Sequence, residues 1–590
     1  MPTRVCHLRL LIVAPALLTI AASGLRAQSP QLFQGDWVGE MRVGGTPTFI
    51  RARFATDSTG PIVRIDIPTS QAWGLRGRLS AGPGSNFGFD FPFGPDTAHF
   101  DGTSTPSSIT GRVRLTKGEG TLYLVHRLAY DSAFVRSLAG TYALAADHII
   151  SMGPLDEAGG WLAFFDNKTL RGGILYALSD STFFSGPSYG IDYPIAIRAT
   201  VHRDATGRVD ARWWSDVTRE AGGGRREAGG GKREAGGGKR EAGGGKREAA
   251  SRSWARRLND FTVEKDVSFK NGDVRLVGDL TLPNTRGPHP AVIMIHGCCG
   301  SKPTRDFGYW STYLAHHGFA VLAYDRRGGG ASGGDFNSAT YDDVAGDVVA
   351  GFDMLARRAD IDPKRIGVFG TSNGGYVAPL AAVRSGGRIA FIVVRSGSAR
   401  RVGDNIDYEV GNDLRSHGFD SIAVRRGVEL RRRVTDFVID RPVISVAAWD
   451  SLRAEIKTVR SEPWYPWART IWVMYVSPAD SGGAAYINSL RRSWSYDPIP
   501  LWRQVKVPVY IMLGGLDRSV PTAESAPVFR SVFRESGNRD ATVRVYPRGN
   551  HGLLAARTGF DDEARYLSYY LPGFQDSVVS WIRRHVSLVR

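Results

Sequence analysis

The chain contains little cysteine, and this scarcity excludes two kinds of stabilising site. Its 590 residues include three cysteines, Cys6, Cys298 and Cys299. A disulfide framework needs several well-spaced cysteines, so we expect none. No spacing of Cys and His is typical of a metal site, and the sequence predicts neither a metal ion nor another cofactor. We interpret the adjacent pair Cys298–Cys299 as two small residues in a tight turn, with a thiol switch as the alternative.

Long apolar runs are also scarce, and the one that is present lies at the start of the chain. Arg4 and Arg9 precede an apolar core, Leu10–Ala22, and small residues follow it. This is the pattern of a secretory signal peptide, predicted at residues 1–27 with Gln28 as the new N-terminus. The core is shorter than a spanning helix, although a retained anchor is the alternative. We therefore expect a protein that is exported, periplasmic or secreted, without stable membrane insertion.

Acidic residues are fewer than basic ones: the chain has 58 Asp and Glu and 75 Lys and Arg, which gives a formal net charge of +17. The excess is uneven: the segment Arg219–Arg257 holds twelve basic and five acidic residues, hence +7. The remaining charge is spread along the chain without a recognition motif or an interleaving of basic and aromatic residues. The composition therefore does not indicate a nucleic-acid partner, and it does not specify an oligomeric state.

That basic segment contains an internal repeat. Arg-Glu-Ala-Gly-Gly-Gly-Lys recurs with a period of seven from Arg219 to Glu248. A coiled coil has the same period, but a glycine costs about 1 kcal/mol relative to alanine in a helix, and the repeat has no apolar seam. The composition instead predicts a flexible, disordered linker over residues 218–257.

The part of the chain before this linker is predicted to be β-rich. Short alternating runs such as Trp37–Val43, Thr48–Phe54 and Ile62–Ile67 are separated by turn residues. This spacing is typical of a sandwich or barrel. We expect a β-rich domain over residues 28–135 and a second β-rich unit over residues 136–217, neither of which carries a catalytic constellation.

The pentapeptide from Gly370 to Gly374 carries the strongest functional signal. It reads Gly-Thr-Ser-Asn-Gly and joins a short apolar run to an apolar-periodic stretch. A Gly-x-Ser-x-Gly sequence between a strand and a helix is typical of a nucleophile elbow, whereas an ordinary Gly-Ser loop is the alternative. Ser372 is the candidate nucleophile, and the backbone N–H of Asn373 is a candidate oxyanion donor.

Two further residues follow predicted strands in the chain order of a catalytic triad. The run Val507–Leu513 ends shortly before Asp517, and the run Ala541–Tyr546 precedes His551. The order serine, acid, histidine is that of α/β-hydrolases. In such a triad His551 takes the proton of Ser372 and Asp517 orients the imidazole. A surface-loop histidine and a turn aspartate are the alternatives.

A second oxyanion donor is expected from the loop that follows the apolar run Ala291–Ile295. This loop begins His296-Gly297-Cys298. The backbone N–H of Cys298 is the candidate donor, because the second N–H of such a hole comes from the loop after an earlier strand. We interpret His296 as a structural hydrogen-bonding residue of this turn.

A little over half of the chain, from Phe261 to the C-terminus, resembles bacterial α/β-hydrolases. The resemblance is to the group of dienelactone-hydrolase-like, serine-aminopeptidase-like (S33) and prolyl-oligopeptidase-like enzymes, nearest to secreted esterase-type members. It implies an α/β-hydrolase domain over residues 258–590, with a helical cap at about 400–505. Cys298–Cys299 departs from the small non-thiol residues that are usual there. The matching segments are His296–Gly297, Tyr324–Gly333, Asp360–Gly367, Gly370–Gly375, Asp497–Pro500 and Gly549–His551.

The resemblance and the triad together predict an exported serine hydrolase, a carboxylesterase that forms an acyl-serine intermediate. A serine peptidase of the prolyl oligopeptidase or aminopeptidase type is one alternative, so the partner is a small-molecule ester or a peptide. The other alternative is an inert hydrolase body whose β domains bind a ligand. Six cap aromatics are expected either to line an acyl or leaving-group pocket or to form the core of the cap: Trp464, Tyr465, Trp467, Trp472, Tyr475 and Trp494.

Overall fold

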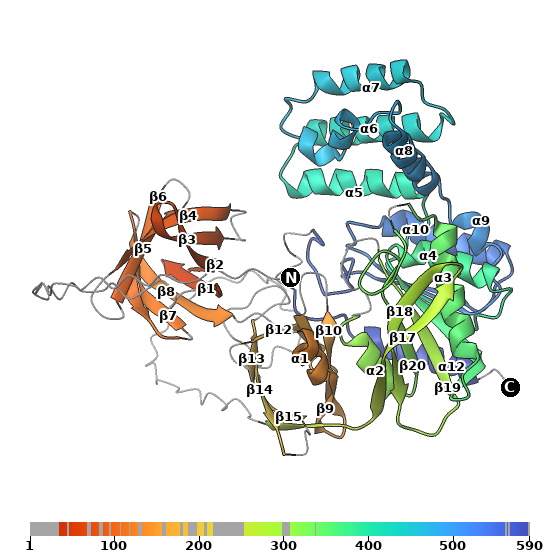
Figure 1. Cartoon of the computed structure of the whole chain (residues 1–590), viewed down its shortest axis with the longest axis horizontal. Coiled ribbons are helices and arrows are strands. Elements are labelled where there is room, and N and C mark those ends of the chain that lie inside the picture. Colours follow the sequence, from red (N-terminus) through yellow and green to blue (C-terminus); the bar gives the residue numbers. More distant parts are fainter. Residues whose placement is uncertain are drawn as a thin grey trace, which may run out of the picture.

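The structure is a computed structural model, and it contains two β-barrels followed by an α/β domain with a helical cap (Figure 1). Among the described residues, no helix is both long and apolar enough to cross a membrane. The structure describes residues 35–43, 46–67, 72–81, 86–93, 96–106, 108–116, 118–127, 132–155, 161–177, 181–186, 197–205, 209–215, 253–297, 307–336, 338–560, 563 and 567–587. The predicted signal peptide lies outside them.

The first barrel is a closed antiparallel meander in which β1 pairs with both β2 and β8. Buried and exposed residues alternate along its strands, as expected when one face of each strand points into a barrel. Its interior is filled by apolar side chains that include Trp37, Phe89 and Phe100. The strands are β1 (Gly35–Val43), β2 (Thr46–Asp57), β3 (Gly60–Ile67), β4 (Ala72–Ala81), β5 (Asn86–Phe93), β6 (Asp96–Ser104), β7 (Ser108–Leu115) and β8 (Gly118–Arg127).

The second barrel closes through a strand that the sequence does not reveal. It comprises β9 to β16, with a short helix α1 before β9. The elements are α1 (Ser132–Leu138), β9 (Gly140–Ala145), β10 (His148–Leu155), β11 (Trp161–Asp166), β12 (Gly172–Ala177), β13 (Thr182–Ser185), β14 (Ile197–Arg203), β15 (Val209–Ser215) and β16 (Ser253–Arg257).

Strand β16 corrects the predicted end of the linker. The prediction assigned residues 253–257 to the disordered linker, but they pair with β15 and with β9. The strand holds because Ala255 is buried in the barrel core and the Arg257 guanidinium donates to the carbonyls of Ser137 and Ala139, at 3.1 and 2.5 Å. The repeat is thus an insertion between two neighbouring barrel strands, and its residues 216–252 lie outside the described ones.

The α/β domain is built on an eight-stranded sheet of order β17-β18-β20-β19-β21-β22-β23-β24. The turn at Asn271–Gly272 joins β17 to β18 at the antiparallel edge, and β19 to β24 form the parallel part of the sheet. The strands are β17 (Phe261–Asn271), β18 (Val274–Pro283), β19 (His289–Ile295), β20 (Ala320–Tyr324), β21 (Ile361–Thr371), β22 (Ile392–Arg395), β23 (Val509–Gly514) and β24 (Ala541–Tyr546).

Helices cover both faces of this sheet, so that each face has its own apolar core. One core includes residues of α3, α4, α9 and α10, and the other includes residues of α2 and α12. Phe165 of β11 belongs to the second core and stacks on Tyr309 at 4.9 Å, which docks the second barrel against the α/β domain. These helices are α2 (Trp310–His316), α3 (Tyr341–Ala356), α4 (Gly374–Arg384), α9 (Ile499–Trp502), α10 (Thr522–Glu535) and α12 (Phe574–Ser587).

The chain between β22 and α9 forms the helical cap, with an apolar core of its own. The cap lies over the end of the sheet where α4 begins (Figure 1). Its elements are α5 (Val402–Ser416), α6 (Ser421–Ile439), α7 (Val446–Thr458), the 3-10 helices η3 (Tyr465–Ala468) and η4 (Ile471–Met474), and α8 (Ser481–Trp494).

Candidate active site

Ser372 lies in a sharp turn between β21 and α4. Its φ angle is +53°, in the left-handed region that non-glycine residues rarely adopt. Close packing explains the glycine at position 370, because a Cβ there would lie 2.6 Å from the carbonyl oxygen of Gly374. The turn therefore combines a strained serine with a close backbone approach, the local geometry that the Gly-x-Ser-x-Gly pattern predicts.

Asp517 and His551 form a hydrogen-bonded pair on the loops that follow β23 and β24. The imidazole Nδ1 lies 3.0 and 2.9 Å from the two carboxylate oxygens of Asp517. The carboxylate is buried, and its Oδ1 also accepts hydrogen bonds from the backbone N–H groups of Ser519 and Val520, each at 2.8 Å. These donors fix the carboxylate so that it can orient the imidazole.

The end of β22 holds the serine turn and the histidine loop beside each other. The N–H of Ser372 donates to the carbonyl of Arg395 at 2.9 Å. The next residue, Ser396, donates through its hydroxyl to the carbonyl of His551 at 2.7 Å. Two consecutive residues thus anchor both loops. The three residues of the predicted triad follow the carboxyl ends of β21, β23 and β24, at the same end of the parallel strands.

The electrostatic surroundings of His551 favour its protonated form. Burial lowers the pKa of the imidazole, but the charge of Asp517 and the hydrogen bond to it act in the opposite direction. Arg395 lowers the pKa and Glu409 raises it, and the net result is a pKa above the ordinary value of 6.5. A histidine in this setting is a stronger base than a free imidazole, which suits the acceptance of a proton from a hydroxyl.

The loop after β19 begins with a buried histidine, His296. His296 is buried with its Nε2 2.6 Å from the carbonyl oxygen of Tyr324. Burial lowers its pKa to about 4, so the neutral ring donates to that carbonyl, in keeping with the structural role predicted for it. Cys298, the predicted second oxyanion donor, lies outside the described residues. Asn373, the other predicted donor, occupies the N-cap of α4.

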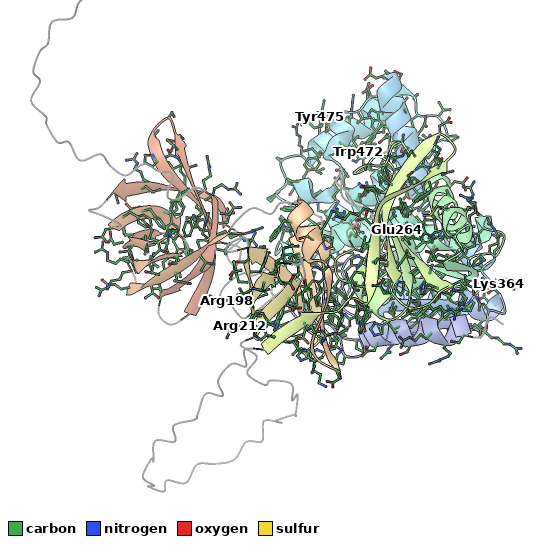
Figure 2. All side chains as sticks on the ribbon, turned by 60° about the horizontal axis from the view of Figure 1, so that its bottom comes forward. Arg198, Arg212, Glu264, Lys364, Trp472 and Tyr475 are labelled. Atoms are coloured by element: carbon green, nitrogen blue, oxygen red, sulfur yellow. The ribbon has the colours of Figure 1, made fainter. Side chains whose placement is uncertain are left out.

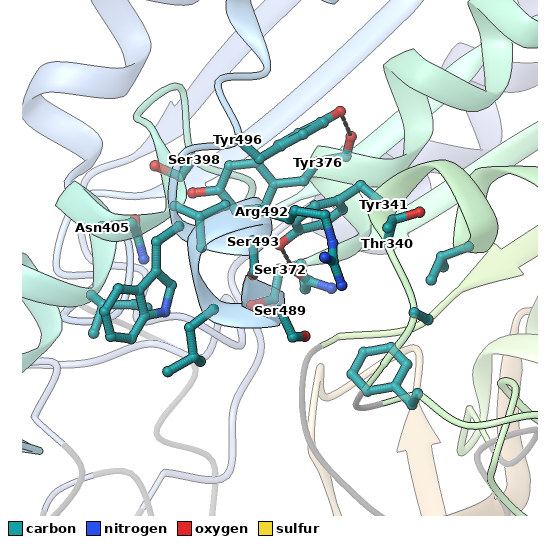
Figure 3. A pocket seen from close by; sticks show the side chains of 18 of the residues that line it. Thr340, Tyr341, Ser372, Tyr376, Ser398, Asn405, Ser489, Arg492, Ser493 and Tyr496 are labelled. Atoms are coloured by element: carbon teal, nitrogen blue, oxygen red, sulfur yellow. Dashed lines mark hydrogen bonds between the residues drawn. The ribbon is translucent and has the colours of Figure 1, made fainter. Parts of the chain in front are cut away.

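A cavity of about 820 Å³ lies between the cap and the Ser372 turn (Figure 3). Ser372 and Asn373 belong to its lining, and Tyr341 and Tyr496 stack with ring centroids 4.2 Å apart on one side of it. The Tyr341 hydroxyl donates to Asn373 Oδ1 at 2.6 Å. The cavity therefore gives a substrate access to the serine, and its tyrosine side contacts the residue after the nucleophile.

Only two of the six cap aromatics predicted for the pocket or the cap core line this cavity: Trp472 and Trp494. Trp464 and Tyr465 are buried in the core of the cap. The remaining two face solvent, and Tyr475 is 73% exposed although Trp472 lies close by in the chain (Figure 2). Trp467 stacks on His417 at the surface, with ring centroids 3.5 Å apart.

The lining also contains charged residues of the cap that the sequence interpretation missed: Glu409, Arg431, Arg469 and Arg492. A signal for Arg431 exists in the sequence. It falls on the buried face of α6, in the stripe formed by Val424, Gly427, Val434 and Val438. A charged side chain in such an apolar stripe is a candidate for a functional group.

Helix α5 of the cap contacts the loop that carries Asp517. The Tyr408 hydroxyl donates to the carbonyl of Asp517 at 2.9 Å, and the Asn412 side chain donates to that of Arg518 at 2.8 Å. The side chain of Asn405 donates to the carbonyl of Ser519 at 3.0 Å. Three successive carbonyls are held in this way, so the cap contributes to the position of the predicted acid.

The sheet order, the turn at Ser372 and the cap give the C-terminal part of the chain an α/β-hydrolase fold. Residues 286–460 match the family model described as "Serine aminopeptidase, S33". This match confirms the serine-hydrolase group that the sequence resembles. It includes Ser372 and ends before Asp517 and His551.

Known proteins match this chain over limited lengths. The chain is 32% identical over 133 residues to an uncharacterised protein of Pseudomonas aeruginosa, covering 22% of this chain and 35% of that protein. It is 33% identical over 136 residues to the quorum-quenching protein AidA of Acinetobacter baumannii, covering 22% and 42%. A solved esterase of Pyrococcus furiosus is 18% identical, covers 55% of this chain and 91% of that one, and has a TM-score of 0.34. The chain thus spans less than half of the length of these two curated relatives.

Proposed function

We propose that this chain is a serine hydrolase that cleaves carboxylic esters through an acyl-Ser372 intermediate, with His551 and Asp517 as the other members of its triad. The observation that carries the proposal is the strained Ser372 turn, which opens into the cavity and is anchored by Arg395, next to the residue, Ser396, that anchors the His551 loop. The match to a serine hydrolase family includes this turn.

The mechanism follows from the roles that the geometry allows. His551 accepts the proton of the Ser372 hydroxyl as the oxygen attacks the ester carbonyl, and Asp517 stabilises the resulting imidazolium. The oxyanion is held by the backbone N–H groups of Asn373 and Cys298, each worth about 2.7–4 kcal/mol of transition-state stabilisation. His551 then protonates the leaving alcohol, and a water molecule repeats the sequence to release the acid.

A peptidase is the second candidate, because the matched family is named for a serine aminopeptidase. Glu409 lines the cavity, and its carboxylate could receive the ammonium group of a peptide N-terminus. It is, however, paired with Arg469 at 2.9 Å, so an incoming amine would have to replace an existing cation. This competition favours the ester.

Parallel assays on p-nitrophenyl esters of graded acyl length and on aminoacyl and prolyl p-nitroanilides separate these functions. Turnover of esters with little turnover of anilides is the expected result, and the acyl-length optimum measures the space available in the cavity. Efficient anilide turnover alone would replace the esterase with a peptidase. If the folded protein turned over neither class, the inert body with ligand-binding β domains would be favoured.

Export is part of the proposal and is supported by the basic start and apolar core of residues 1–27. N-terminal sequencing of the protein recovered from the periplasm or medium of a bacterial host tests it. The expected new N-terminus is Gln28. An unprocessed chain confined to the membrane fraction would favour the retained anchor.

A further inference from the structure

Arg431 is a buried cation in the lining of the cavity that contains Ser372. Its side chain is 1% exposed, and neither Nε nor Nη1 has a hydrogen-bond partner. Oδ1 of Asp407 lies 3.9 Å from Nε, beyond hydrogen-bond distance. A buried guanidinium with unsatisfied donors is costly, so its presence calls for an explanation.

Of the other charged side chains in the lining, Glu409, Arg469 and Asp342 have partners, whereas Arg492 is exposed. Glu409 accepts a hydrogen bond from Arg469 at 2.9 Å, and Arg469 also pairs with Asp413. Asp342 lies 3.0 Å from Arg384. Arg431 differs from all of these because it is buried and its Nε and Nη1 have no hydrogen-bond partner.

The guanidinium of Arg431 is held in a fixed orientation. It lies over the ring of Trp494 with its central carbon 4.1 Å from the ring centroid, and Trp494 packs edge-on against Trp472 at 5.8 Å. Stacking of this kind leaves the edges of the guanidinium plane available for two parallel hydrogen bonds. Burial lowers its pKa to about 10, so the group remains charged at neutral pH.

We propose that Arg431 binds a carboxylate of the substrate, so that the preferred substrates are esters that carry a free carboxylate elsewhere in the molecule. The assignment rests on the proposed function for the position of the reacting ester at Ser372. A planar carboxylate matches the guanidinium edge in a bidentate pair. The lining carries two carboxylates, Glu409 and Asp342, and three guanidinium groups, Arg431, Arg469 and Arg492. Its net charge of +1 favours a monoanion over a dianion such as a phosphate monoester.

The test compares two substrates that differ at one end. The p-nitrophenyl monoester of glutaric acid ends in a carboxylate, whereas p-nitrophenyl valerate ends in a methyl group at the same position. We expect the wild-type protein to prefer the charged ester, and Arg431→Met to reduce the ratio of the two kcat/KM values by about 10- to 100-fold. Arg431→Lys should retain part of the ratio. A ratio that Arg431→Met leaves unchanged would overturn the proposal.

A matched control comes from the same helix. Arg433 is exposed and pairs with Glu455 at 3.2 Å, so Arg433→Met removes one positive charge of α6 outside the cavity. It should leave the ratio within about twofold of wild type, since a surface charge contributes little. An equal loss in both variants would mean that the total charge of the cap, and not the group in the cavity, sets the preference.

A binding measurement keeps this inference separate from the proposed function. Calorimetry on Ser372→Ala should detect monomethyl glutarate and not neutral dimethyl glutarate, whether or not the wild-type protein hydrolyses either ester. Inorganic phosphate that bound more tightly than monomethyl glutarate would overturn the carboxylate assignment. If Arg431→Met failed to fold, inhibition of wild-type valerate hydrolysis by the monoanion glutaramate but not by glutaramide would support the proposal, and equal inhibition by both would contradict it.

Discussion

At the scale of single residues, the account depends on backbone strain and on one hydrogen-bonded pair. Ser372 holds a φ of +53°, a conformation that costs on the order of 1–3 kcal/mol and persists where surrounding contacts enforce it. The Asp517–His551 pair raises the pKa of the imidazole through charge and hydrogen bonding in spite of its burial. Each feature gives a measurable consequence.

The raised pKa of His551 sets the pH dependence. Because the base must be neutral, kcat/KM should rise with pH through an inflection above 6.5, the ordinary histidine value. The same pair stabilises the folded protein only while His551 is protonated, so its contribution to stability is complete below the unfolded pKa and is lost as pH rises through the folded pKa. Asp517→Asn should lower kcat by about 10⁴-fold. A wild-type inflection below 6.5 would contradict this assignment.

The glycine of the serine turn predicts a steric effect. Gly370→Ala would place its Cβ 2.6 Å from the carbonyl oxygen of Gly374, and overpacking of this kind typically costs about 1–3 kcal/mol. We expect a lower free energy of unfolding together with a loss of ester turnover. Gly482→Ala on α8 is the control, because its Cβ would meet no atom within 4 Å. Similar urea denaturation midpoints for the two variants would contradict the steric explanation.

At the scale of elements, α5 connects the cap to the site. Its side chains donate to three successive carbonyls of the acid loop, at residues 517, 518 and 519. The cap is therefore more than a lid over the cavity. It helps to hold the loop from which the predicted acid reaches His551.

Removal of one of these donors tests the connection. Asn412 is buried and donates to the carbonyl of Arg518 at 2.8 Å, so Asn412→Ala leaves that carbonyl without this donor, at a cost of about 1–3 kcal/mol. We expect kcat to fall about tenfold with little change in KM, because the acid loop and not the cavity is disturbed. Asn488→Ala, at an exposed position on α8, should change neither constant. Equal kinetics in both variants would separate the cap from catalysis.

Much of the element level could be predicted from the sequence, because local patterns determine it. The Asn271–Gly272 hairpin, the turn at Ser372 and the α6 and α7 helices follow from periodicity and turn chemistry. Strand β16 could not be predicted, since its arginines continue the basic repeat and their partners come from α1, β9 and β15, which are distant or separated by the repeat in the sequence. The division of the cap aromatics between core, cavity and solvent also depends on packing that no single segment encodes.

At the scale of the whole molecule, the repeat is an insertion in the second barrel. The strands on either side of it are neighbours, with Trp213 opposite Ser253 in the register of β15 and β16. A short connection could join such strands, and longer loops add little to the entropy of closure. The barrel docks on the α/β domain through Phe165, so an intact barrel supports the catalytic domain.

Shortening this insertion therefore should have little effect. Removal of two repeats, fourteen residues between Arg219 and Glu248, is expected to leave the melting temperature within a few degrees and ester turnover within about twofold of wild type. Deletion of β16 is the contrasting change and should destabilise the barrel. Loss of activity in the shortened chain would mean that the repeat has a role beyond that of a connection.

The most direct measurement of the central claim is covalent labelling of the folded, mature protein with a fluorophosphonate, followed by mass spectrometry of the labelled peptide. The account predicts one adduct, on Ser372, that is absent from Ser372→Ala and slowed in His551→Ala. An adduct on another residue, or no adduct in protein whose circular dichroism shows that it is folded, would contradict the assignment of Ser372 as the nucleophile.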